Sequence, residues 1–90
     1  MAHYVVFRTI RLNPNHRPTG GTQHYHGNKE LPPPTELKII KYSDAPGYYL
    51  LYLDEHGREL TDTYHETLED ALSQAEWEFN IKHSEWIILD

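Results

Sequence analysis

T-D-T-Y-H-E-T-L-E-D-A-L-S-Q-A-E-W-E-F, residues 61–79, predicts the end of a strand followed by one amphipathic helix. Thr67 is a favourable N-cap residue, and Asp70 three positions later resembles the acidic partner of a capping box. Asn80 suits the left-handed conformation that ends many helices. Between these signals, apolar or small residues recur at helical spacing: Leu68, Ala71, Leu72, Ala75 and Phe79. The stretch therefore predicts a helix that covers one face of a sheet.

The opposite side of this helix carries the candidate binding residues. Trp77 lies about 180° from Leu68 around the helix axis. A loop, for example residues 13–35, would cover Trp77, or else the indole is an exposed anchor for a partner. Tryptophan is enriched among binding hot spots, and surrounding acids select a basic partner. The candidate partner-binding residues are Trp77, Glu69, Asp70, Gln74, Glu76 and Glu78.

Five stretches favour β-strands. Residues 3–12, 36–42, 48–53 and 58–64 are rich in β-branched and aromatic side chains, and residues 85–89 follow the helix. We expect an α+β fold in a single domain over residues 1–90. Its sheet would have four or five mostly antiparallel strands, with the helix packed on one face. A strand–helix–strand crossover would make the last strand parallel to a neighbour.

The turn at residues 54–57 predicts a pairing register for the hairpin. Gly57 can take the left-handed position of a three-residue turn, in which Asp54 pairs with Arg58. A two-residue turn at residues 56–57 would instead shift the pairing by one. In the first register, the side chains that share the helix-facing side are Tyr48, Leu50, Tyr52, Leu60 and Tyr64, together with the polar Asp62.

Composition limits the classes of protein. The 90 residues include no cysteine, so neither disulfides nor thiolate ligands are available. The formal net charge is −6, and residues 54–90 hold eleven acidic and two basic residues, against three acidic and six basic ones before them. No stretch approaches the roughly 18 apolar residues of a membrane helix, and no signal pattern is visible. We expect a cytoplasmic protein with an acidic surface that steers a basic partner.

Residues 13–35 have no periodicity and predict a long, mobile loop. The segment contains three consecutive prolines and a cluster of histidines, in which His24 and His26 are weak candidates for metal ligands. A zinc site needs three or four ligands, and no Asp or Glu lies between His16 and Glu30. Neither a motif for an activated nucleophile nor one for a phosphate-binding loop is present. We therefore expect neither an enzyme nor a cofactor.

Two other functions remain open. A sheet that shows aromatic rings near lysines can stack single-stranded nucleic acid, and the candidates are Lys38, Lys41, Tyr42 and Tyr49. The acidic net charge argues against phosphate binding. A homodimer could also form through a sheet face that presents Tyr49, Leu51 and Leu53.

Residues 47–79 carry a resemblance to a known group of proteins. Their sequence, G-Y-Y-L-L-Y-L-D-E-H-G-R-E-L-T-D-T-Y-H-E-T-L-E-D-A-L-S-Q-A-E-W-E-F, resembles short bacterial proteins with a D-x-x-G turn, an L-T-D-T strand and an L-E-D-A-L-x-Q-A helix. Some of these are similar to immunity proteins encoded beside secreted polymorphic toxins. The resemblance implies a non-enzymatic inhibitor that occludes its toxin, and it brings no catalytic residues.

Overall fold

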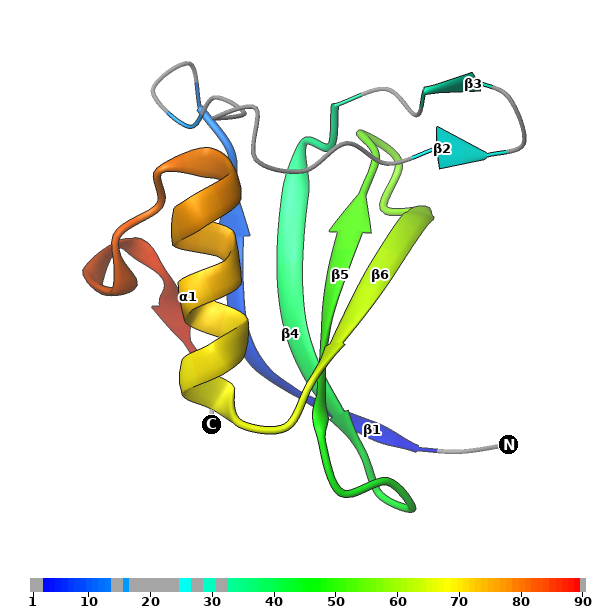
Figure 1. The fold of residues 1–90 in the computed structure, drawn as a ribbon, viewed down its shortest axis with the longest axis vertical. Coiled ribbons are helices and arrows are strands. Elements are labelled where there is room, and N and C mark those ends of the chain that lie inside the picture. Colours follow the sequence, from blue (N-terminus) through cyan, green and yellow to red (C-terminus); the bar gives the residue numbers. More distant parts are fainter. Residues whose placement is uncertain (1–2, 14–15, 17–24, 27–28, 31–32, 90) are drawn as a thin grey trace.

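A computed structural model describes residues 3–13, 16, 25–26, 29–30 and 33–89. Five strands form one sheet in the order β6-β5-β4-β1-β7, in which all neighbours are antiparallel, and α1 packs on one face of it (Figure 1). The predicted α+β fold is confirmed. The elements are β1 (Tyr4–Arg11), β2 (Tyr25–His26), β3 (Lys29–Glu30), β4 (Glu36–Tyr42), β5 (Tyr48–Leu53), β6 (Glu59–His65), α1 (Leu68–Phe79), the 3₁₀ turn η1 (His83–Glu85) and β7 (Ile87–Ile88).

Both predicted ends of α1 are confirmed. The Thr67 hydroxyl accepts a hydrogen bond from the backbone N–H of Asp70 at 3.1 Å, which satisfies a donor that the first turn of a helix leaves free. Asn80 has φ 58°, and its N–H donates to the Glu76 carbonyl at 2.8 Å. These local contacts fix where the helix begins and ends.

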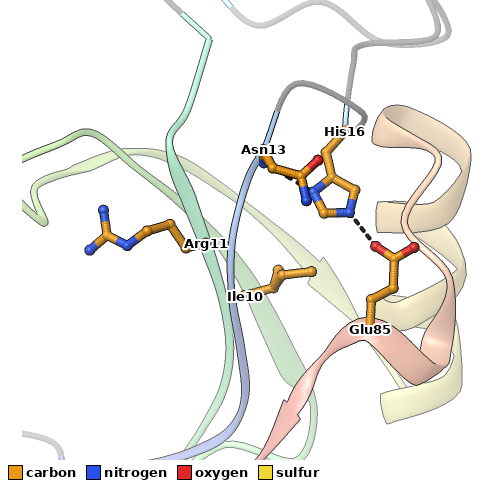
Figure 2. A pocket seen from close by; sticks show the side chains of 5 residues that line it. All are labelled: Ile10, Arg11, Asn13, His16 and Glu85. Atoms are coloured by element: carbon orange, nitrogen blue, oxygen red, sulfur yellow. Dashed lines mark hydrogen bonds and ion pairs between the residues drawn. The ribbon is translucent and has the colours of Figure 1, made fainter.

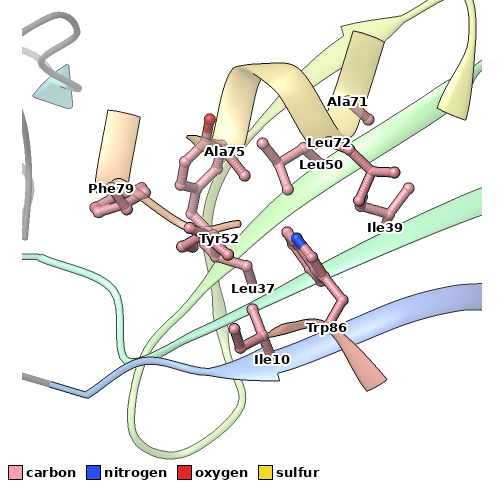
Figure 3. Close-up of a cluster of buried hydrophobic side chains, with 11 residues drawn as sticks. Ile10, Leu37, Ile39, Leu50, Tyr52, Ala71, Leu72, Ala75, Phe79 and Trp86 are labelled. Atoms are coloured by element: carbon pink, nitrogen blue, oxygen red, sulfur yellow. The ribbon is translucent and has the colours of Figure 1, made fainter. Parts of the chain in front are cut away.

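The core lies between α1 and the sheet (Figure 3). Removal of the apolar side chains of this core from water is the main force that holds the helix on the sheet. Trp86, in the segment that links η1 to β7, is buried in the same cluster. The cluster consists of Ile10, Leu37, Ile39, Leu50, Tyr52, Ala71, Leu72, Ala75, Phe79, Ile81 and Trp86.

The hairpin of β5 and β6 begins as predicted but changes register at Leu60. Asp54 donates its N–H to the Arg58 carbonyl at 2.9 Å, and Gly57 has φ 79°. A bulge then inserts Leu60, so that Tyr52 pairs with Thr61 and not with Leu60. From this point the predicted pairing is wrong by one residue, and the strand's side chains change faces. Tyr64 therefore lies on the sheet face away from the helix.

β7 also departs from the prediction, because its neighbour β1 is antiparallel to it, with Arg8 opposite Ile88. The chain crosses from β6 at one edge of the sheet to β7 at the other. Three alternating strands separate β6 and β7, so the two run in the same direction without touching. The last strand thus runs parallel to β6, but the expectation that it would lie beside a parallel neighbour is wrong.

The apolar side chains of β1 do not alternate regularly along the strand, and a bulge at Phe7 explains why. The pairing with β4 shifts between Val6 and Arg8. As a result, Val6 packs on the sheet face away from the helix while Ile10 joins the main core. One strand thus contributes apolar side chains to both faces.

The segment predicted as a long loop contains the short pair β2–β3, in which Tyr25 lies opposite Glu30. Its two ends meet at the sheet, where the N–H of Leu12 donates to the Thr35 carbonyl at 2.9 Å. The predicted mobility concerns residues 14–15, 17–24, 27–28 and 31–32, which lie outside the described part of the chain.

Candidate functional site

The outer side of α1 presents Trp77 among acidic side chains. The indole is 51% exposed, and Glu69, Asp70 and Glu76 are also exposed. The helix contains no lysine or arginine. Glu76 lies near the C-terminal end, where a negative charge interacts unfavourably with the helix dipole. Its carboxylate is 3.6 Å from the His83 imidazole, which offsets this effect when the histidine is protonated.

The prediction that Glu78 belongs to the exposed binding surface is wrong, because this side chain is only 3% exposed. Its carboxylate accepts a hydrogen bond from the Tyr52 hydroxyl and another, at 2.9 Å, from the half-buried Gln74 amide. Burial, and then the hydrogen bond to Glu78, raise the pKa of Tyr52 far above its ordinary value. These contacts give Glu78 a structural role between α1 and β5, and leave Glu69, Asp70, Glu76 and Trp77 as the exposed set.

A histidine of β6 lies beside this buried group. The His65 ring is hydrogen-bonded to the Thr63 hydroxyl at 2.7 Å. Burial lowers the pKa of His65, and the charges of Asp70 and Glu78 oppose that shift. The arrangement favours a neutral imidazole held by its neighbours.

A shallow pocket between β1 and η1 brings together two residues that sequence analysis did not connect, His16 and Glu85 (Figure 2). The His16 Nδ1 accepts from the Asn13 N–H at 3.1 Å, so the proton of a neutral ring lies on Nε2, which donates to Glu85. That hydrogen bond lowers the pKa of the Glu85 carboxyl. Both ring nitrogens are engaged, so His16 is not available as a general base. The pair ties residue 16 to the C-terminal segment.

The sheet face away from α1 carries a row of tyrosines that spans β1, β4, β5 and β6. Adjacent rings meet edge to face, with centroids 5.9, 5.4 and 5.2 Å apart along the series Tyr4, Tyr42, Tyr49 and Tyr64. Two acids of β6 lie near the row. Burial, followed by the charges of Glu59 and Asp62, raises the pKa of Tyr42.

The structure brings together only part of the nucleic-acid candidates. Tyr42 and Tyr49 are in contact, as described above. Lys38 pairs with Leu51 on the tyrosine face, whereas the Lys41 ammonium lies 5.4 Å from the ring centroid of Tyr48, which packs against the helix-side core. The two lysines therefore point to opposite faces, and the acids beside the tyrosines would repel phosphate.

The homodimer candidates on this face are mostly covered within one chain. Leu51 and Leu53 are buried together with Ile40, and Tyr49 is half-buried against them. These three side chains therefore offer little apolar surface of their own to a second copy.

Gly47 supports the end of the tyrosine row, which leads to a prediction. A Cβ at this position would overlap the Tyr64 ring. We expect Gly47→Ala to displace that ring and to lower the free energy of unfolding by about 1 kcal/mol through loss of the contact with Tyr49. Chemical denaturation of a double-mutant cycle checks this: in a Tyr64→Ala background, Gly47→Ala should have almost no effect. Additive effects of the two substitutions would contradict the proposed contact.

The metal candidates fall outside what the structure describes, since His24 and the side chain of His26 are not described. Within the described ranges, no group of three or more potential ligands is arranged to hold a metal ion. In the same part of the chain, no helix has the length and apolar character to cross a membrane. Comparison with protein-family models, with curated proteins and with solved structures found no match.

Proposed function

We propose that the protein is a non-enzymatic binding module that recognises a basic protein through the outer side of α1. The observation that carries the proposal is the half-exposed Trp77 within a group of exposed acids, Glu69, Asp70 and Glu76. A large aromatic ring gains binding energy when it leaves water, and the acids accelerate encounter with a positive surface. Trp77 is the anchor, and the carboxylates select the partner.

The resemblance of residues 47–79 to immunity-type proteins suggests how such binding acts. An inhibitor of this type occludes the working surface of a toxin and needs no catalytic groups of its own. A basic toxin surface fits the acidic side of α1 by charge. We therefore propose an immunity-type inhibitor as the specific form of this binding module.

We expect Trp77→Ala to reduce capture of the partner at least about tenfold, since truncating an interface anchor removes more than about 1.4 kcal/mol. The double variant Glu69→Lys/Glu76→Lys should reduce it similarly and remove its dependence on salt. The measurement is quantitative affinity purification from the source cells with tagged variants. The matched control is Tyr4→Ala, which truncates an aromatic ring of similar exposure on the other sheet face. Equal capture by all variants would rule out this side of α1 as the binding surface.

The immunity hypothesis makes a separate prediction. The captured partner should be a toxin encoded beside this chain, and co-expression of the wild-type chain, but not of Trp77→Ala, should protect cells from it. If Trp77→Ala abolishes capture of a partner that is not toxic, the binding-module proposal stands and the immunity-type inhibitor is ruled out.

A further inference from the structure

The β7 edge of the sheet exposes three consecutive apolar side chains. Ile87, Ile88 and Leu89 are 59%, 70% and 55% exposed. β7 is the last strand of the five-stranded sheet, and among the residues that the structure describes its one pairing partner is β1, on its inner side. Exposed apolar residues on a strand with an unpaired edge favour the addition of another strand.

The backbone of β7 shows which groups point outward. The N–H of Leu89 donates to the Phe7 carbonyl at 3.0 Å, so Leu89 faces β1. In an antiparallel pair, the backbone groups of successive residues point to alternate sides of the strand. The N–H and C=O of Ile88, which lies opposite Arg8, therefore point away from β1. The most exposed side chain of the edge thus belongs to the residue with outward-facing backbone groups.

The other edge of the sheet differs in character. β6 carries the acids Glu59 and Asp62 and has a bulge at Leu60. Charges and bulges are features that protect an edge strand from pairing with another copy. Ile87 and Ile88, by contrast, are both uncharged and β-branched. A second copy would be repelled at β6 and accepted at β7.

We propose that two copies of the chain associate through β7, antiparallel, about a two-fold axis at Ile88. In this register each Ile88 exchanges two backbone hydrogen bonds with Ile88 of the second copy. Ile87 of one copy then lies opposite Leu89 of the other on one face of the joined sheet. The sequence is complementary to itself in this arrangement, because both sides contribute the same apolar residues.

The geometry of this dimer has two consequences. The two sheets become one continuous sheet with five strands from each copy, and both helices lie on the same face of it. The interface is small, so the dimer is in equilibrium with the monomer and its fraction rises with concentration. The dimer contact lies on β7 and the proposed partner-binding residues on α1, so the two proposals concern different elements.

Sedimentation of the full chain over about a hundredfold range of concentration tests the proposal, with an expected shift from monomer to dimer. Ile88→Lys should weaken association about a hundredfold, because each substitution acts twice at a two-fold axis. Ile88→Pro, which removes the outward N–H without removing a hydrogen bond to β1, should also weaken it. Tyr64→Lys is the matched control, since it places the same charge at another exposed apolar side chain, 48% exposed, on the opposite edge and should leave association unchanged. Circular dichroism confirms that each variant is folded.

Hydrogen exchange gives a second readout that a change in fold stability would not reproduce. The Ile88 amide should exchange rapidly in dilute protein and become protected as concentration rises, while the Leu89 amide is protected throughout. A chain that remains monomeric at all concentrations would overturn the proposal. So would a dimer that Ile88→Lys and Ile88→Pro leave intact, since its contact would lie on another surface.

Discussion

Phe79→Ala is expected to lower the free energy of unfolding by about 3 to 5 kcal/mol, because it removes a buried aromatic ring and leaves a cavity. Phe79 is 4% exposed, and its ring centroid lies 6.2 Å from that of Tyr52 at the C-terminal end of α1. Domains of this size have a total stability of about 5 to 15 kcal/mol. The substitution should therefore lower the Tm by more than about 10 °C. Thermal and chemical denaturation measure the effect.

Trp77→Ala is the matched comparison, because it removes a larger aromatic ring two residues earlier on the same helix. The Trp77 side chain is half exposed, so we expect a loss of about 1 kcal/mol or less. The pair of substitutions tests which side of α1 faces the sheet. A larger loss for Trp77→Ala than for Phe79→Ala would reverse the orientation of the helix and with it the proposed binding surface.

The helix could be predicted from the sequence because its signals are local. Thr67 satisfies an N–H of the first turn, and Asn80 adopts the left-handed conformation at the end. Both depend on residues within a few positions of each other. The apolar spacing of Ala71, Ala75 and Phe79 gives the buried side with the same reliability, because helix geometry is fixed.

The bulges in β1 and β6 could not be placed in the same way, since a bulge is defined by the partner strand. Leu60 carries no local sign that it is the extra residue. The bulge at Phe7 does leave a sign in the sequence, because the apolar residues of β1 do not alternate regularly. The shift in pairing between Val6 and Arg8 explains this irregularity. The pairing of β7 with β1 and the contact of His16 with Glu85 join residues far apart in the chain, so no short pattern indicates them.

The position of Glu78 in the helix indicates burial, but its charge favours an exposed position. Glu78 follows Ala71 by seven positions, which places the two side chains on nearly the same side of a helix. A carboxylate is seldom buried without hydrogen-bond donors, and the donors here come from Tyr52, on another strand, and from Gln74. Helical position alone indicates burial, against the exposed position predicted for Glu78, but the partner that makes burial tolerable is visible only in the fold.

This buried group predicts a loss of stability at alkaline pH. Burial and the hydrogen bond to Glu78 raise the pKa of Tyr52 well above the value near 10 of an unfolded chain. Below about pH 10 the hydroxyl is protonated in both states. At higher pH the unfolded chain loses this proton while the folded chain keeps it, so the folded state binds one more proton. The free energy of unfolding should then fall by about 1.4 kcal/mol per pH unit.

Chemical denaturation between about pH 8 and pH 12 measures how the free energy of unfolding falls with pH. Tyr52→Phe should make this slope less steep by the contribution of one proton, about 1.4 kcal/mol per pH unit. All other groups are shared by the two proteins, so only the difference between the two curves is diagnostic. Glu78→Gln separates the causes: it removes the negative charge but keeps Tyr52 buried, and burial is the larger cause of the raised pKa, so most of the slope should remain. Identical curves for the wild type and Tyr52→Phe would show that the Tyr52 hydroxyl ionises as readily in the folded chain as in the unfolded one, which its contact with Glu78 does not allow.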